Sequence, residues 1–422
     1  MLDLDFIRKN SELVKQNTLN RNSQADIDEL LRLDEDRRSL IATIEELRST
    51  RNKVSRQHQK PSAEEIIEMK KVGEEIVELE KKLTDIEEAL KKIWLSVPNL
   101  THSEVLVSDD ENNNPVLEQV GEMPKFFFEA KDHLELALNL DLLDLEKAAK
   151  VTGAKFYYLK KELAVLQLAL VQYVMKMIID KGYSALNGPD LIKTELLEAL
   201  GFNPRGESSQ VYHLEEHGLS LIGTSEVTLG AYHANEVLEQ KALPLKYVSH
   251  SRCYRTEAGS YSKFSKGIFR VHQFDKVEMF VFCLPEDSEK IHNELLAIQK
   301  EIFNSLGLTY RIVDHCTADL GAPALRTFDL EAWFPGKPNT QGEIGDWGEV
   351  TSVSQCGDYQ SRGLNIKYLQ DNGEKALVHT LNGTGIAVTR AIAAIMEQFQ
   401  TADGKVSIPE VLWPYTGFKS LE

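Results

Sequence analysis

The sequence is poor in cysteine, and its few cysteines are scattered. None of them belongs to a CxxC pair or to a Cys/His cluster with metal-ligand spacing; the four are Cys253, Cys283, Cys316 and Cys356. We therefore expect reduced thiols, with neither a disulfide framework nor a structural zinc ion.

Targeting and membrane signals are also lacking. The N-terminus, MLDLDFIRKN, has neither the basic start nor the apolar core of a signal peptide. The most apolar long run, ELAVLQLALVQYVMKMIIDK, is interrupted by Gln167, Gln172 and Lys176. It predicts a buried or amphipathic helix and no membrane span. Together with reduced thiols, these features predict a cytoplasmic protein.

Positive charge is scarce as well. The chain of 422 residues has 48 Lys and Arg against 66 Asp and Glu, a net charge of −18, which argues at first against a nucleic-acid partner. One block, LRSTRNKVSRQHQK at 47–60, has no acidic residue; its Lys and Arg are Arg48, Arg51, Lys53, Arg56 and Lys60. Taken alone, the block is better explained as a solvated helix end than as a binding site.

Apolar residues recur every seven positions in two runs within residues 28–93. They include Leu33, Leu40, Leu47 and Val54, and then Met69, Ile76, Leu83 and Leu90. This spacing predicts two antiparallel helices of about 30 residues each, in a coiled-coil arm about 45 Å long. Pro61 and Ser62 mark the break between them, so the basic block lies near the tip, where it suits a long anionic partner. Arg37 and Arg51 occupy seam positions and predict imperfect or partner-facing packing there.

Beyond a linker rich in Pro, Asn and Asp near residue 100, helical and strand patterns mix without a regular βαβ alternation. Strand patterns lie at 244–256, 269–283, 308–314, 327–334 and 347–354. This order favours an α+β domain, an antiparallel sheet with flanking helices. We expect an arm over residues 1–102 and a body over residues 103–422.

Two neighbouring strand patterns carry charged and aromatic residues at strand spacing. Alternation places Arg270, Phe274 and Glu278 of GIFRVHQFDKVEMF on one face, and Arg255 and Glu257 of SRCYRTEAG on one face. Guanidinium groups suit phosphate and carboxylate oxygens, and an aromatic face suits a nucleobase. Each residue taken alone is more commonly a member of a surface ion pair.

A third stretch, LNGTGIAVTRAIAAIMEQFQ, predicts a glycine-flanked turn at 382–385 that opens an apolar helix bearing Arg390. Glycines let a ligand approach the backbone, and an arginine early in a helix meets an anion or stacks on a ring. The sequence has no GxxxxGK[ST] and no GxGxxG between a strand and a helix, which excludes a P-loop and a dinucleotide fingerprint.

These residues carry a family resemblance. YRTEAG…GIFRVHQFDKVE resembles motif 2 of the class II aminoacyl-tRNA synthetases, and NGTGIAVTRAIAAIMEQ resembles motif 3. LIGTSEV, FDLEAWFPG, GEVTSVSQCGDYQSR and IPEVLWPY are similar to seryl-tRNA synthetases of the bacterial and organellar type, over essentially the whole chain. The resemblance implies a six-to-seven-stranded antiparallel sheet, a homodimer formed through IIDKGYSALNGPDLI, and an arm that binds tRNA(Ser) and, where it exists, tRNA(Sec).

The resemblance further implies an ATP-dependent ligase that makes seryl-adenylate and transfers serine to the tRNA 3′ end. L-serine would be bound by Thr224, Glu226, Arg255, Glu278, Asn382 and Thr384. ATP would be bound by Arg255, Glu257, Arg270, Val271, Phe274, Glu349, Val350, Thr351, Ser352 and Arg390. The adenine would lie between Phe274 and Arg390, and Mg²⁺ on Glu349 and Ser352. The catalytic residues would be Arg255, Glu278 and Arg390. The tRNA would meet the basic block, while His272 and Lys276 receive no ligand role.

Four positions depart from the family pattern: Lys266, Gln355, Gly363 and Trp413. None is assigned to serine or ATP, so we expect activity with altered kinetic detail. Two alternatives stay open. A synthetase-like paralogue that charges a carrier protein or an antibiotic precursor would be expected to lose the arm. A non-catalytic RNA-binding protein would have no reason to keep Arg255, Glu278, Glu349 and Arg390 together.

Overall fold

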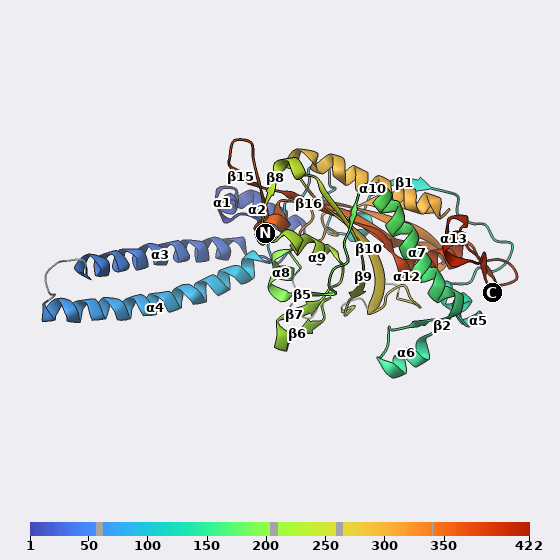
Figure 1. The fold of residues 1–422 in the computed structure, drawn as a ribbon, viewed down its shortest axis with the longest axis horizontal. Helices are drawn as coiled ribbons and strands as arrows, with labels where there is room; N and C mark the ends of the chain where they lie inside the picture. The colour runs from blue at the N-terminus through green and yellow to red at the C-terminus, as the bar shows by residue number, and fades with distance from the viewer. Residues whose placement is uncertain (56–61, 203–209, 259–264, 340) are drawn as a thin grey trace. The chain divides into compact units, whose positions relative to one another are not determined.

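The computed structural model describes residues 1–422 except 56–61, 203–209, 259–264 and 340. Its contacts divide the chain into two units (Figure 1). One unit is Leu2–Pro98, and the other is Asn99–Glu422 together with Met1.

The first unit is helical. Its elements are α1 (Leu4–Lys9), α2 (Ser11–Asn20), α3 (Ile27–Ser55) and α4 (Ala63–Trp94). Helices α3 and α4 lie side by side, as the heptads predict (Figure 1). A capping box begins α4: the Ser62 hydroxyl accepts from the Glu65 amide at 3.1 Å, and the Ser62 amide donates to the Glu65 carboxylate at 2.7 Å.

At the seam position of Arg37, the helices are joined by ion pairs. Asp34, which is fully buried, lies 2.6 Å from Arg8, 3.1 Å from Arg38 and 3.4 Å from Arg37. Arg37 also lies 3.9 Å from Glu87 on α4. A charge cluster of residues from α1, α3 and α4 therefore occupies the seam at the position for which imperfect or partner-facing packing is predicted.

The second unit is built on an eight-stranded sheet, ordered β1-β11-β12-β13-β16-β10-β9-β4. Its strands are β1 (Val116–Val120), β4 (Ser184–Ala185), β9 (Leu245–Tyr254), β10 (Gln273–Cys283), β11 (Tyr310–Asp314), β12 (Arg326–Pro338), β13 (Ile344–Gly357) and β16 (His379–Ala387). All neighbours are antiparallel except β4 and β9. The predicted α+β antiparallel fold is confirmed, but the strand number is not six or seven, because short strands β1 and β4 extend the two edges.

Helices cover this sheet. The principal ones are α7 (Lys161–Asp180), α10 (Ser288–Ser305) and α12 (Val388–Gln398). Helix α5 (His133–Asn139) packs against α12, and α6 (Leu145–Val151) packs against β3 (Tyr158–Leu159). By length and composition α7 could cross a membrane. However, Leu166, Leu170, Val174 and Ile178 on α7 are fully buried in the core cluster of the sheet, as expected of a core helix.

Shorter elements complete the unit. The remaining helices are α8 (Thr194–Ala199), α9 (Glu226–Gly230), α11 (Tyr359–Leu364) and α13 (Trp413–Thr416). Minor sheets are formed by β2 (Leu143–Asp144) with β3 (Tyr158–Leu159), β5 (Leu191–Lys193) with β7 (Leu219–Leu221) and β6 (His213–Leu214), β8 (Val237–Glu239) with β14 (Lys367–Leu369) and β15 (Lys375–Leu377), and β17 (Val406–Ser407) with β18 (Ser420–Leu421).

Two local predictions are wrong. Residues 382–385 form no turn, because they lie inside β16, where Asn382 and Gly383 pair with both β10 and β13 and Thr384 pairs with β10. Gly385 lies where the register with β10 shifts, and a Cβ there would approach Ile178 to 2.8 Å, so this glycine lets α7 pack closely. Arg255, Glu257 and Arg270 lie just outside β9 and β10, so strand alternation does not place them.

Candidate active site

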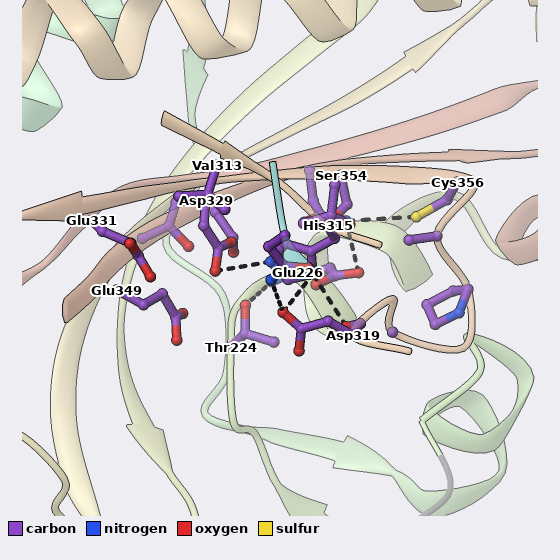
Figure 2. A pocket seen from close by; sticks show the side chains of 18 of the residues that line it. Thr224, Glu226, Val313, His315, Asp319, Asp329, Glu331, Glu349, Ser354 and Cys356 are labelled. Atoms are coloured by element: carbon purple, nitrogen blue, oxygen red, sulfur yellow. Dashed lines mark hydrogen bonds and ion pairs between the residues drawn. The ribbon is translucent and has the colours of Figure 1, made fainter. Parts of the chain in front are cut away.

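A pocket of about 450 Å³ lies among side chains of β10, β12, β13 and β16 and of the segment 224–226. Every residue that the resemblance assigns to serine lines it: Thr224, Glu226, Arg255, Glu278, Asn382 and Thr384. Figure 2 shows that the wall is acidic, since Glu226, Asp329, Glu331 and Glu349 are among the residues that line it. Such a wall favours ligands that bring cations.

Glu226, at the start of α9, is a buried carboxylate held by neutral donors. Gln360 Nε2 donates to it at 2.8 Å and Asn382 Nδ2 at 3.0 Å, both to Oε1. Burial and then the nearby Glu278 carboxylate raise the pKa of Glu226 to about 7. A carboxylate in this environment is stabilised strongly by a cation that enters with a ligand.

Glu278 on β10 differs from Glu226 because it has a cation within the protein. Its Oε2 lies 2.6 Å from Lys276 Nζ and accepts a 3.1 Å hydrogen bond from Thr384 Oγ1. Lys276 is 6% exposed and lines the pocket. Lys276, expected to be a structural or edge contact without a ligand role, does not lie at an edge, because β10 is an interior strand between β16 and β9. His272 does act structurally, donating from Nδ1 to the Arg255 carbonyl at 2.8 Å.

A second, smaller cavity adjoins the pocket and shares Arg255, Arg270, Lys276, Glu349, Ser352 and Thr384 with it. Every residue assigned to ATP lines this cavity: Arg255, Glu257, Arg270, Val271, Phe274, Glu349, Val350, Thr351, Ser352 and Arg390. The arrangement places a polar, carboxylate-lined pocket directly beside a cavity that carries arginines and aromatic rings.

Arginines and rings pair within this second cavity. The Arg255 guanidinium lies 5.3 Å from the centre of the Phe274 ring, and that of Arg390 lies 5.1 Å from Phe269. Arg270 Nη1 lies 3.3 Å from the Glu257 carboxylate. Phe269 is a lining residue that the sequence reasoning missed, although it precedes Arg270 directly.

Glu349 and Ser352 on β13 are the residues expected to hold Mg²⁺. Arg390, 3.1 Å from Glu349, holds the pKa of that carboxyl well below its usual range against the opposing effect of burial, so Glu349 is ionised at neutral pH. An ionised carboxylate and a hydroxyl fit Mg²⁺, which binds through one or two carboxylates plus substrate phosphates. In the part of the chain that is described, no cluster of three or more His, Cys, Asp or Glu residues could hold a metal ion.

The sequence reasoning also missed a buried acid–base cluster in the pocket (Figure 2). His315 Nε2 lies 2.9 Å from Asp329 Oδ2, and Nδ1 lies 3.4 Å from Asp319. Burial opposes the charged imidazolium, but Asp329 and Asp319 together outweigh it and raise the pKa of His315 to about 10. Burial, in turn, raises the pKa of Asp329 to about 6, so at neutral pH the proton resides on His315. In FDLEAW, acidic and apolar residues alternate, and this pattern could have indicated that Asp329 and Glu331 lie on one face of a strand.

The basic block lies partly within the described chain. Arg48, Arg51 and Lys53 are exposed on α3, and Arg48 lies 2.7 Å from Glu80 on α4. Arg56 and Lys60 fall outside the described residues, as does most of the loop at 258–268. The described part of the basic block is therefore exposed at the C-terminal end of α3.

The four departures lie away from the residues assigned to serine and ATP. Lys266 pairs with Asp132, Gln355 Nε2 donates to Ser288 Oγ at 2.9 Å, and Trp413 Nε1 donates to the Ile408 carbonyl at 2.9 Å. At Gly363 a Cβ would lie 2.0 Å from the Ala199 carbonyl oxygen. The close contact of α11 with α8 thus explains why this chain has glycine and not arginine there.

We expect Gly363→Ala to destabilise the fold by about 2 kcal/mol or more, since backbone on both helices must move. The measurement is the thermal unfolding midpoint. Gly73→Ala in α4 is the control, because a Cβ there meets nothing within 4 Å. Equal midpoints for the wild type and Gly363→Ala would contradict the steric explanation.

Comparison with known proteins gives concordant results. The sequence model of the seryl-tRNA synthetase N-terminal domain matches residues 1–101, and that of the tRNA synthetase class II core domain (G, H, P, S and T) matches residues 210–399. A serine–tRNA ligase of Treponema denticola is 47% identical over 99% of both chains, and one of Dictyoglomus thermophilum is 45% identical over 100% of this chain and 99% of its own. The crystal structure of the Pyrococcus horikoshii seryl-tRNA synthetase complexed with ATP superimposes with a TM-score of 0.86 at 37% identity, over 100% of this chain and 99% of that one.

Proposed function

The chain belongs to the seryl-tRNA synthetase family, and we propose from this premise how its pocket performs serine–tRNA ligation. The activity is that of a serine–tRNA ligase, which uses ATP. The observation that carries the assignment of the site is the adjoining pair of cavities, one lined by all residues expected for serine and the other by all residues expected for ATP. Neither the paralogue nor the non-catalytic alternative is favoured.

In the activation step, a serine carboxylate oxygen attacks the α-phosphorus of ATP and pyrophosphate leaves. Two anions must approach each other, so cations at the junction of the cavities lower the barrier. Arg255 and Arg270 line both cavities and suit this role. No general base is needed, because the carboxylate is already ionised, and positioning carries much of the rate.

We assign the two ends of serine to different carboxylates. The ammonium group goes to Glu226 beside Thr224, and the hydroxyl goes to Glu278 with Thr384 and Asn382. Polar groups directed at the hydroxyl would be left unpaired by alanine, which lacks it, and a tight pocket would exclude the methyl group of threonine.

Serine binding is expected to be pH-dependent through Glu226. Because its carboxyl has a pKa of about 7 and must ionise to hold the ammonium, serine binding releases a proton. Affinity should rise about tenfold per pH unit up to pH 7 and then level off. Calorimetric titrations with serine in buffers of different ionisation enthalpy measure the released proton directly. Glu226→Gln should bind serine weakly and without this pH dependence; a flat profile for the wild type between pH 5.5 and 8 would contradict the assignment.

We assign Mg²⁺ to Glu349 and Ser352. The ion would neutralise charge on the phosphates of ATP during the displacement. Arg390 would keep Glu349 ionised and oriented through contacts of 3.1 Å to its carboxylate and 3.0 Å to its carbonyl oxygen.

We propose that the helical unit binds the tRNA through the basic block, Arg48, Arg51, Lys53, Arg56 and Lys60. Its exposed part on α3 supports this in a chain of net charge −18. The acceptor would be tRNA(Ser), and tRNA(Sec) in an organism that has it. Four buried free thiols accord with a cytoplasmic enzyme.

We also propose a homodimer. Strand β4 ends the main sheet with exposed residues, and α6, β3 and α7 expose apolar side chains, among them Val151 (68%) and Leu168 (67%). Leu168→Arg is expected to shift the protein to monomer, since it places a charge in an apolar interface. Analytical ultracentrifugation measures the change, with Leu138→Arg on α5, also exposed, as the comparison. A wild type that sediments as a monomer would overturn the proposal.

The function is tested by charging total tRNA with labelled serine, threonine and alanine in parallel. We expect attachment of serine alone, to tRNA(Ser). Charging of a carrier protein in place of tRNA would favour the paralogue instead.

A further inference from the structure

Lys276 connects the two cavities. It is buried at 6% exposure in the interior strand β10, and it lines both the serine pocket and the adjoining ATP cavity. Its ammonium group lies 2.6 Å from Glu278 Oε2 and 3.4 Å from Thr384 Oγ1. Burying a lysine is costly unless the charge is paired, so the position requires the carboxylate.

The two carboxylates of the serine pocket differ in what neutralises them. Glu278 is 1% exposed and has Lys276 as its cation. Glu226 is 8% exposed, and its hydrogen bonds come from the neutral amides of Gln360 and Asn382. Consequently one carboxylate has a cation at ion-pair distance before a ligand enters, whereas within the described residues the other has only the more distant charges of Lys276 and Arg255.

We propose that Lys276 is the positioning residue that sorts the two ends of serine between these carboxylates, an inference that rests on the proposed function. By neutralising Glu278, it leaves Glu226 as the carboxylate that takes the substrate's ammonium. By contacting Glu278 Oε2, the same oxygen that accepts from Thr384, it orients that carboxylate to accept the serine hydroxyl. Lys276 thus acts on specificity through Glu278.

The inference predicts a change of specificity and not a uniform loss. Without the ammonium, Glu278 is a buried carboxylate without its cation, and it attracts the substrate's ammonium in competition with Glu226. Serine then loses its charge-assisted hydroxyl contact, whereas alanine, which has no hydroxyl, loses much less. Lys276→Met should therefore lower the serine-over-alanine ratio of kcat/KM by about 10- to 100-fold, with KM for ATP changed less than about threefold.

The experiment measures ATP–pyrophosphate exchange with serine and with alanine for wild type, Lys276→Met, Glu278→Gln and the double variant. Because Lys276 acts through Glu278, adding Lys276→Met to Glu278→Gln should change the serine-over-alanine ratio less than about twofold. The double variant replaces the ion pair by neutral groups of similar size. It therefore shows whether Lys276 affects the ratio only through Glu278, even if Lys276→Met alone fails to fold. Lys246→Met is the control: this lysine on the neighbouring strand β9 pairs with Glu294 at 2.6 Å and lines neither cavity.

Parallel losses for serine and alanine in Lys276→Met, or a further large fall of the ratio when it is combined with Glu278→Gln, would overturn the inference. A rise in KM for ATP with an unchanged ratio would instead make Lys276 a phosphate ligand and overturn it too. Failure of the proposed function and failure of this inference give different results. If the wild type shows no serine-dependent exchange, the proposed function is refuted. If the wild type exchanges normally and Lys276→Met has an unchanged serine-over-alanine ratio, only the role of Lys276 is refuted.

Discussion

Arg255→Ala is expected to reduce serine-dependent ATP–pyrophosphate exchange by about 10³-fold, the largest loss of any single substitution at the site. Arg255 is one of few residues that line both cavities, and its guanidinium stacks near the Phe274 ring at 5.3 Å. It is therefore placed to offset charge on the serine carboxylate and the α-phosphate as they approach. Arg255→Lys should recover little, because a single ammonium cannot reproduce a planar two-pronged contact.

The control for Arg255→Ala is Arg32→Ala. Arg32 is an exposed arginine on α3 that pairs with Glu29 and Asp36, and it belongs to neither cavity. Its removal should leave exchange unchanged. Exchange by Arg255→Ala within about threefold of wild type, in protein of unaltered thermal midpoint, would contradict the assignment of this residue to the reacting groups.

Removing the outer part of the helical hairpin should abolish tRNA charging while serine activation persists. The pairs Arg37–Glu87 and Arg48–Glu80 give the register of α3 against α4, so replacing residues 41–85 by a short Gly/Ser linker cuts both helices at one level. The Asp34 cluster stays intact. We expect charging to fall by about 10³-fold or more, because the phosphate contacts proposed for the basic block would be lost together.

Reversing the charge of two residues in the hairpin tests whether tRNA binding depends on its positive charge or only on its shape. Arg51→Glu with Lys53→Glu keeps the hairpin and should raise KM for tRNA by about 10- to 100-fold, with a smaller dependence on salt. Exchange of ATP and pyrophosphate is the internal control for both variants. Charging that survives the deletion, or a salt dependence unaltered by the reversal, would show that the hairpin is not the tRNA-binding element.

The helical arm could be predicted because its signals are local. Heptads at Leu33, Ile76 and Leu90, and the cap at Ser62, specify a helical hairpin without knowledge of the rest of the chain. The strand patterns likewise specified an antiparallel α+β body. For the site, it was the resemblance and not strand alternation that assembled the residues, since Arg255, Glu257 and Arg270 lie outside the strands.

The missed features depend on long-range packing. Gly385 reads as a turn residue, but its function in the fold is to admit Ile178 of α7, which no local pattern reveals. Lys276 receives no role from its strand pattern, because its burial follows only from the pairing of β10 with β16 and β9. His315 and Asp329 are brought together by the pairing of β11 and β12, and their mutual electrostatics exist only in the folded chain.

The most direct measurement is ATP–pyrophosphate exchange by the purified chain without tRNA, with serine, threonine or alanine as the only amino acid. Adjoining serine and ATP cavities predict exchange that depends on serine, at least about 10³-fold faster in kcat/KM than with alanine, whose missing hydroxyl leaves buried polar groups unpaired. Well-folded protein that shows no serine-dependent exchange, or exchange that is equal for serine and alanine, would contradict the assignment of the pocket.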